Sequence, residues 1–99
     1  MLKKYVIERN IEGVGRLAAC DLGDAAESSN MALAQLSGVQ WQHSYVTENK
    51  TFCIYLAESE EVIYEHARLS GFPADKVTEV KTIIDPTTEQ LTESVRVAA

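Results

Sequence analysis

The sequence has no long apolar run and few basic residues. No apolar segment approaches the roughly 20 residues that a membrane-spanning helix needs. The N-terminal segment carries Lys3 and Lys4 but reaches Glu8 too soon for a secretory signal peptide. A net charge of −6, with the acidic residues spread along the chain, argues against binding to nucleic acid, whose phosphates require clustered cations. We therefore expect a cytoplasmic protein with no nucleic-acid or membrane partner.

Cysteine is scarce, and the common catalytic motifs are missing. Cys20 and Cys53 fall in different predicted elements, so they form no CxxC pair, and a disulfide is not expected in a cytosolic chain. The sequence has no glycine-rich phosphate loop, no serine nucleophile elbow and no HExxH motif. These absences favour a protein that is not an enzyme. They leave the question open, because a His and a Tyr in a pocket can perform acid–base chemistry.

The periodicity of the chain predicts five segments in one domain, which is what 99 residues can support around a single core. Alternating and β-branched residues indicate strands, and apolar residues at three- and four-residue steps indicate helices. The second helix begins with Ser59 as its N-cap and ends at Gly71, where we expect a Schellman cap. The predicted segments are a strand over 4–9, a helix over about 17–36, a hairpin over 39–57, a helix over about 59–70 and a strand over 77–84.

This order of elements is β-α-β-β-α-β. It predicts an α+β, ferredoxin-like fold, in which an antiparallel sheet carries both helices on one face. We expect this domain to occupy residues 1–87, and residues 88–99 to form a C-terminal tail or a short helix. The opposite face of the sheet is left bare, and the simplest partner for a bare face is a second copy. The sequence therefore predicts a homodimer that forms through the open sheet face.

The hairpin holds most of the unusual side chains, so its register matters. On its first strand, Trp41, His43 and Tyr45 share one face. On its second strand we expect the apolar set of Phe52, Ile54 and Leu56 to face the core.

Two registers of this hairpin compete. In the first, the Trp41 face joins the apolar set beneath the helices, and Cys53 and Tyr55 lie on the open face. In the second, the Trp41 face lies on the open face together with Cys53 and Tyr55. Burial of the large aromatic side chains favours the first register. The second would bring His43 and Cys53 together, and imidazole and thiolate suit nickel, copper or zinc.

His66 lies near the middle of the apolar stripe of the second helix. A core histidine with one satisfied ring nitrogen is the favoured interpretation, and a ligand or acid–base group facing a pocket is the other. A metal site would need further ligands, either from a second subunit or from acidic residues such as Glu8, Glu48 and Glu65.

Several segments of the chain resemble a bacterial family of small nickel-binding, ferredoxin-like proteins that was formerly catalogued as a domain of unknown function. The resemblance covers residues 4–87. It implies a dimeric subunit that binds nickel at the dimer surface, with a role in sequestration, and His43, Cys53 and His66 match its pattern as candidate ligands. The segments that carry the resemblance are 5–9 (YVIER), 40–47 (QWQHSYVT), 65–67 (EHA), 71–75 (GFPAD) and 82–87 (TIIDPT).

Two functions follow from these observations. The first is a cytoplasmic homodimer that binds nickel, or another divalent transition metal, through His43, Cys53 and His66, with no organic cofactor. The second is a small-molecule-binding protein or cofactor-free enzyme. Its pocket would lie between helices and sheet, with Trp41, Tyr45 and Tyr55 as possible lining residues and His43, Tyr45 and His66 as the acid–base groups.

Overall fold

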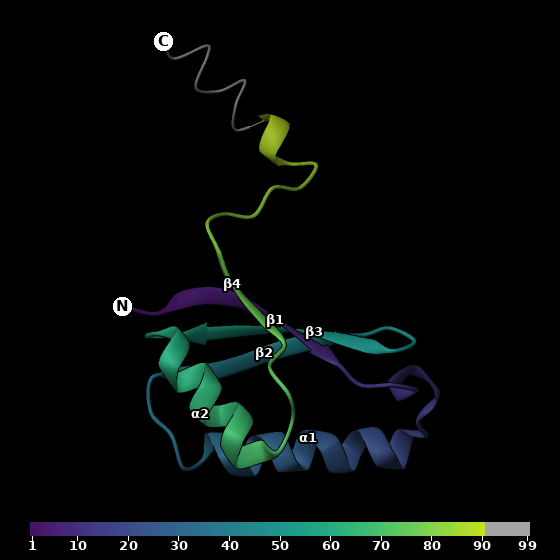
Figure 1. The fold of residues 1–99 in the computed structure, drawn as a ribbon. Coiled ribbons are helices and arrows are strands. Elements are labelled where there is room, and N and C mark those ends of the chain that lie inside the picture. Colours follow the sequence, from purple (N-terminus) through teal and green to yellow (C-terminus); the bar gives the residue numbers. More distant parts are fainter. Residues whose placement is uncertain (91–99) are drawn as a thin grey trace.

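The chain forms one four-stranded antiparallel sheet with both main helices on the same face (Figure 1). This computed structural model describes residues 1–90. The strand order is β2-β3-β1-β4, which is the ferredoxin-like arrangement that the sequence predicts. The elements are β1 (Lys3–Asn10), a 3-10 turn (Val14–Arg16), α1 (Ala19–Leu33), β2 (Val39–Val46), β3 (Lys50–Ala57), α2 (Glu60–Ser70) and β4 (Lys76–Val80).

The core lies between the central strands and the helices. On β1, Tyr5 and Ile7 are buried, and they pair across the sheet with Tyr55 and Cys53 on β3. Ile63 of α2 packs against this cluster from the helix side and is 1% exposed. Because directly paired residues share a face, these pairs define the helix-covered side of the sheet.

The expectation that Phe52, Ile54 and Leu56 face the core is wrong. These residues alternate with buried neighbours on β3 and so lie on the open face, whereas Cys53 and Tyr55 lie under the helices. The reason is that β3 is apolar on both of its faces, so its own pattern does not decide its orientation. The pairing with β1 decides it.

Neither predicted register of the hairpin is observed, because β2 contains a β-bulge at Gln42. Trp41 pairs with Tyr55 on the core side, but His43 pairs with Ile54 on the open side. The bulge inserts one residue between them, so their side chains no longer share a face. The indole N–H of Trp41 donates to Oγ of Ser44 at 3.0 Å, across the bulge.

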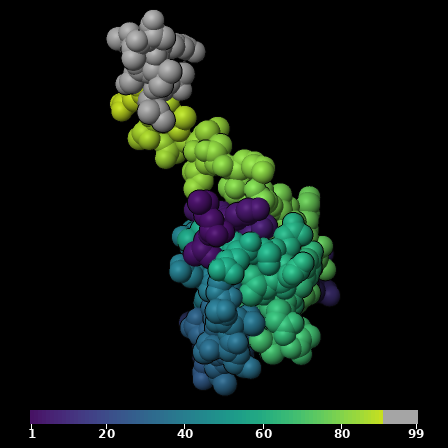
Figure 2. All heavy atoms as spheres, turned by 90° about the vertical axis from the view of Figure 1, so that its left-hand side faces the viewer, coloured from purple at the N-terminus to yellow at the C-terminus, as the bar shows by residue number. Residues whose placement is uncertain are grey.

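The last strand ends earlier than predicted, at Val80 rather than at residue 84. Val80 pairs with Lys4, next to the beginning of β1, so the sheet offers almost no further partner beyond this point. The chain then leaves the body of the domain (Figures 1 and 2), and Ile83 and Ile84 are 64% and 77% exposed. The tail or short helix predicted over 88–99 lies largely outside the described residues.

The ends of α2 differ in detail from the prediction. Ser59 is the N-cap residue, but its side chain makes no capping hydrogen bond. At the other end Gly71 adopts φ 81° and donates its N–H to the carbonyl of Ala67 at 3.0 Å. This is the single-bond left-handed cap and not the full Schellman motif, because the N–H of Phe72 donates to Oγ of Ser70 instead.

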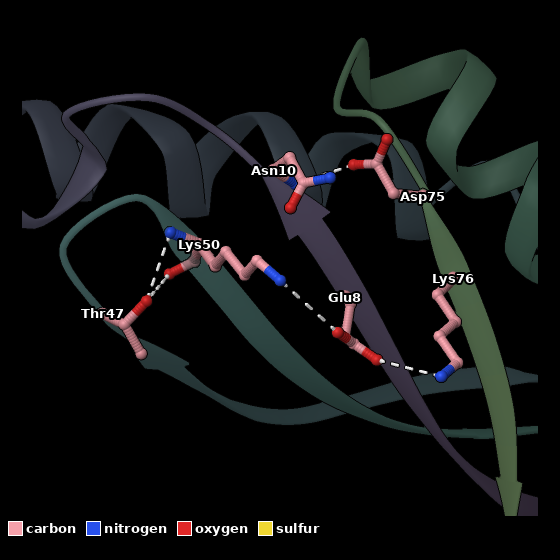
Figure 3. A network of polar contacts seen from close by, with 6 residues as sticks. All are labelled: Glu8, Asn10, Thr47, Lys50, Asp75 and Lys76. Carbon is pink, nitrogen blue, oxygen red and sulfur yellow. Dashed lines mark hydrogen bonds and ion pairs between the residues drawn. The ribbon is translucent and has the colours of Figure 1, made fainter.

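Polar contacts join the strands at one end of the open face (Figure 3). The carboxylate of Glu8 lies 3.9 Å from the ammonium of Lys50 and 4.0 Å from that of Lys76. The backbone N–H of Asn10 donates to Asp75 at 2.7 Å. These contacts tie β1 to both of its neighbours. No helix among residues 1–90 has the length and apolarity needed to cross a membrane.

Two glycines provide a matched test of this packing. A Cβ at Gly15 would lie 2.6 Å from the carbonyl oxygen of Thr47, which is backbone, whereas a Cβ at Gly23 in α1 would meet no atom within 4 Å. We expect Gly15→Ala to lower the free energy of unfolding by about 1–3 kcal/mol through overpacking. Gly23→Ala should raise it by about 0.5–1 kcal/mol, because alanine favours the helix. Urea denaturation of both variants measures the difference, and equal effects would contradict this packing.

Candidate functional site

His43 lies on the edge strand β2 and on the open face of the sheet. Its side chain is exposed, and its Nε2 lies 3.2 Å from the hydroxyl of Tyr45. The two rings meet edge to face, with centroids 5.0 Å apart. His43 is therefore accessible to a metal ion or to a second molecule that approaches this face.

The other two candidate ligands are buried on the opposite side of the sheet. Cys53 is 6% exposed and its Sγ lies 3.5 Å from the hydroxyl of Thr51. His66 is 1% exposed, under α2. The structure thus separates His43 from both Cys53 and His66 within one chain. Among residues 1–90, no group of three or more His, Cys, Asp and Glu side chains could hold a metal ion.

The three carboxylates named as further ligands each have a cationic neighbour. Glu8 lies between two lysines, and Glu48 accepts from Nη1 of Arg16 at 3.1 Å. Glu65 accepts from Arg68, and this hydrogen bond lowers the pKa of the Glu65 carboxyl. A metal ion that recruited one of these carboxylates would have to displace its present partner.

A pocket of about 250 Å³ lies between α1 and the sheet. Its mouth includes the exposed side chains of Leu17, Leu22 and Val46. Of the residues expected at a pocket, Trp41 and Tyr55 line it, whereas Tyr45 lies on the open face and does not. The histidines that were considered with Tyr45 as acid–base groups do not line it either.

The deep end of this pocket is polar. Arg9, Ser29 and Tyr55 all line it and are 3%, 5% and 2% exposed. Oγ of Ser29 lies 3.1 Å from Nε2 of His66, whose ring is in turn 5.3 Å from that of Tyr55. The core histidine therefore belongs to a buried polar cluster, which consists of Arg9, Ser29, Tyr55 and His66.

Two nitrogens of this cluster have no hydrogen-bond partner. Nη1 of Arg9 donates to the carbonyl of Pro73 at 2.6 Å, but Nη2 is buried and unpaired. Nδ1 of His66 is also buried without a partner. Buried polar atoms without a hydrogen-bond partner are uncommon in folded proteins, so these two nitrogens need a physical explanation.

Burial sets the protonation of the cluster. It raises the pKa of the Tyr55 phenol, against smaller opposing effects from Ser29 and Arg9. Burial also lowers the pKa of His66, and the nearby charge of Arg9 lowers it further. Both shifts disfavour the charged forms of these side chains, so Tyr55 and His66 are neutral at pH 7.

A sequence profile described as "Nickel responsive protein SCO4226-like" matches residues 5–80. The chain belongs to this SCO4226-like family. The matched region runs from the first core residue of β1 to the last residue of β4 and includes His43, Cys53 and His66. Membership therefore confirms the resemblance inferred from the sequence over residues 5–80, and the segment 82–87 lies outside the match.

A solved structure supports the fold of this SCO4226-like chain. The crystal structure of SCO4226 from Streptomyces coelicolor A3(2) matches with a TM-score of 0.69 over 82% of this chain and 99% of that one. The two sequences are 15% identical over the match, so the likeness shows the fold alone. No curated protein matches the sequence.

Sequence reasoning missed Arg9 and Ser29 as members of the SCO4226-like chain's buried cluster. The signal was present for Arg9, because it follows Tyr5 and Ile7 at steps of two and so belongs to the core face of β1. Ser29 interrupts an apolar stripe of α1 at a position where a side chain is buried. A charged or polar residue at a core position of the pattern is the cue in both cases.

The lowered pKa of His66 predicts a pH dependence of stability. Below its ordinary pKa of 6.5, the unfolded chain binds a proton at His66 that the folded chain resists. His66 therefore makes stability fall as the pH drops from about 7.5 to about 5. We expect the free energy of unfolding of the wild type, minus that of His66→Gln, to decrease over this range. Urea titrations at several pH values measure it, and a constant difference would contradict the shift.

Proposed function

We propose that this protein is a cytoplasmic homodimer that binds nickel, or a related divalent transition metal, at its open sheet face through His43. One observation carries the choice of residue. Of the three candidate ligands, only His43 is exposed and lies on a face that a second copy could cover. The description of the matching family as nickel responsive is the reason for choosing nickel as the metal.

Each chain offers one exposed imidazole, so the proposed nickel site needs ligands from two copies of the chain. Imidazole nitrogen suits nickel, but one ligand holds a metal ion weakly. A two-fold axis through the open face would present the same residue from both copies. Two imidazoles, with oxygen ligands from protein or water in the remaining positions, form a donor set that Ni²⁺ accepts.

The open face of the sheet carries apolar side chains that a second copy of the chain could cover. Val6, Phe52 and Ile54 form an apolar strip across the central strands, and this strip carries no helix. His43 pairs with Ile54 and so borders the strip on the β2 side. Burying such a strip against a second copy removes apolar surface from water. The exposed Ile83 and Ile84 beyond β4 add further apolar area for an interface.

A second candidate function is the binding of a small molecule in the pocket beneath α1. The buried polar cluster at the end of an apolar cavity favours it. The same cavity is where a cofactor-free reaction would take place, with the phenol of Tyr55 among the hydroxyl-bearing residues that line it.

Nickel binding provides the first test of the main proposal. Titration calorimetry of the tag-free protein with Ni²⁺ should give a dissociation constant well below about 1 mM. His43→Gln should weaken binding by at least about tenfold, because it removes the imidazole nitrogen from both copies. Cys53→Ser and His66→Gln are the matched controls, and both should bind nickel as the wild type does. Loss of binding in either buried variant but not in His43→Gln would overturn the assignment.

Dimerisation is tested separately. We expect Ile54→Lys to shift the protein from dimer to monomer in sedimentation equilibrium, because it places a charge in the apolar strip that the interface would desolvate. The exposed helical substitution Glu27→Lys should leave the dimer unchanged. A monomeric wild type at micromolar concentration would contradict the proposed assembly.

A further inference from the structure

The buried guanidinium of Arg9 lacks a counter-ion. It is 3% exposed, and no ion pair joins it to a carboxylate of residues 1–90. Its hydrogen bonds go to the carbonyls of Phe72 and Pro73, and both come from Nη1. A charge that is buried without an opposite charge is costly, and the cost is larger when one of its donors is unpaired.

The pocket that Arg9 lines changes in character with depth. Leu17, Leu22 and Val46 are 41%, 37% and 45% exposed and form an apolar mouth. Ala25, Ala26 and Trp41 continue the apolar wall. The buried polar residues of the lining are Arg9, Ser29, Thr51 and Tyr55. A ligand that fits this gradient has an apolar body and a polar group that enters first.

We propose that this pocket binds a small organic carboxylate, with its carboxylate against the guanidinium of Arg9 and its apolar body between α1 and the sheet. An arginine donates to a carboxylate with charge-assisted hydrogen bonds, which are stronger than neutral ones. The bound carboxylate supplies both missing features of Arg9, the counter-ion and the acceptor. Ser29 and Tyr55 also line the pocket and are buried.

The charge and the size of the ligand follow from the lining. Among residues 1–90, Arg9 is the only charged side chain that lines the pocket, and burial raises the pKa of the Tyr55 phenol and so favours its neutral form, so a single negative charge is complementary. An apolar cavity of about 150 Å³ accepts benzene, and drug-sized ligands need about 300 Å³ or more. A volume of about 250 Å³ therefore suits a one-ring aromatic or short-chain carboxylate.

A purely structural role for Arg9 explains fewer of these observations than a carboxylate site does. It explains why Nη1 holds the segment between α2 and β4 through the carbonyl of Pro73. It does not explain why Nη2 has no hydrogen-bond partner in a residue that lines a cavity. The carboxylate site is also independent of the metal proposal, because His43 lies on the opposite side of the sheet. One proposal can fail without the other.

The test compares carboxylates with their uncharged amides on the wild-type protein. Cinnamate and hexanoate are the probes, and cinnamamide and hexanamide are the matched neutral molecules. We expect calorimetry to give a dissociation constant below about 1 mM for at least one carboxylate. Its amide should bind at least about tenfold more weakly, because it lacks the charge that Arg9 pairs with. Equal affinity of acid and amide would overturn the proposal.

Variants locate the site. Arg9→Met keeps the length of the side chain and removes its charge, and should abolish carboxylate binding. If this variant does not fold, Ala26→Leu tests the same pocket with Arg9 intact, since it fills the apolar wall. Ser28→Leu makes a comparable change on an exposed position of α1 that does not line the pocket, and should bind as the wild type does. Undiminished binding in Ala26→Leu, or no binding of either carboxylate to the wild type, would overturn the proposal.

Discussion

The pairing of β1 with β3 is the constraint on which the rest of the structure depends. Tyr5 opposite Tyr55 and Ile7 opposite Cys53 decide which face of the sheet the helices cover. Once this face is set, the period of two along β1 and β3 decides the face on which each remaining side chain of these two strands lies. The same pairing sends Arg9 into the core and Ile54 onto the open face. Both proposed sites, one on each side of the sheet, are consequences of it.

The sequence was sufficient for the order and approximate limits of the elements because most of them have one clear periodicity. Helix α2, for example, lies between Ser59 and Gly71 in the structure, as predicted. The hairpin was different. Phe52, Cys53 and Ile54 are all apolar enough to be buried, so the pattern of β3 fits both orientations. The bulge at Gln42 leaves no trace in periodicity, and it is what separates Trp41 from His43.

The difference between a clear periodicity and an ambiguous strand orientation also explains what could be predicted of the candidate sites. His43, Cys53 and His66 are recognisable as ligand types from their chemistry, and the family profile agrees with a connection to nickel. Whether they meet depends on register, which the sequence left open, and the structure separates His43 from the other two within one chain. Arg9 shows the reverse case. Arginine is not a typical metal ligand, but Arg9 lies beneath the helices and is the one Arg, Lys, Asp or Glu side chain among residues 1–90 that is buried.

The bulge at Gln42 also affects how two sheets could meet. β2 is an outer strand of the sheet, and its free edge bears exposed residues such as Tyr45 and Val46. A regular outer strand offers a continuous row of N–H and C=O groups to which a foreign strand can add. The bulge interrupts that row near its middle, between one segment that ends at Trp41 and another that starts at His43. Growth of the sheet by edge-to-edge addition is thereby discouraged, which protects a small domain with an apolar hairpin from aggregation.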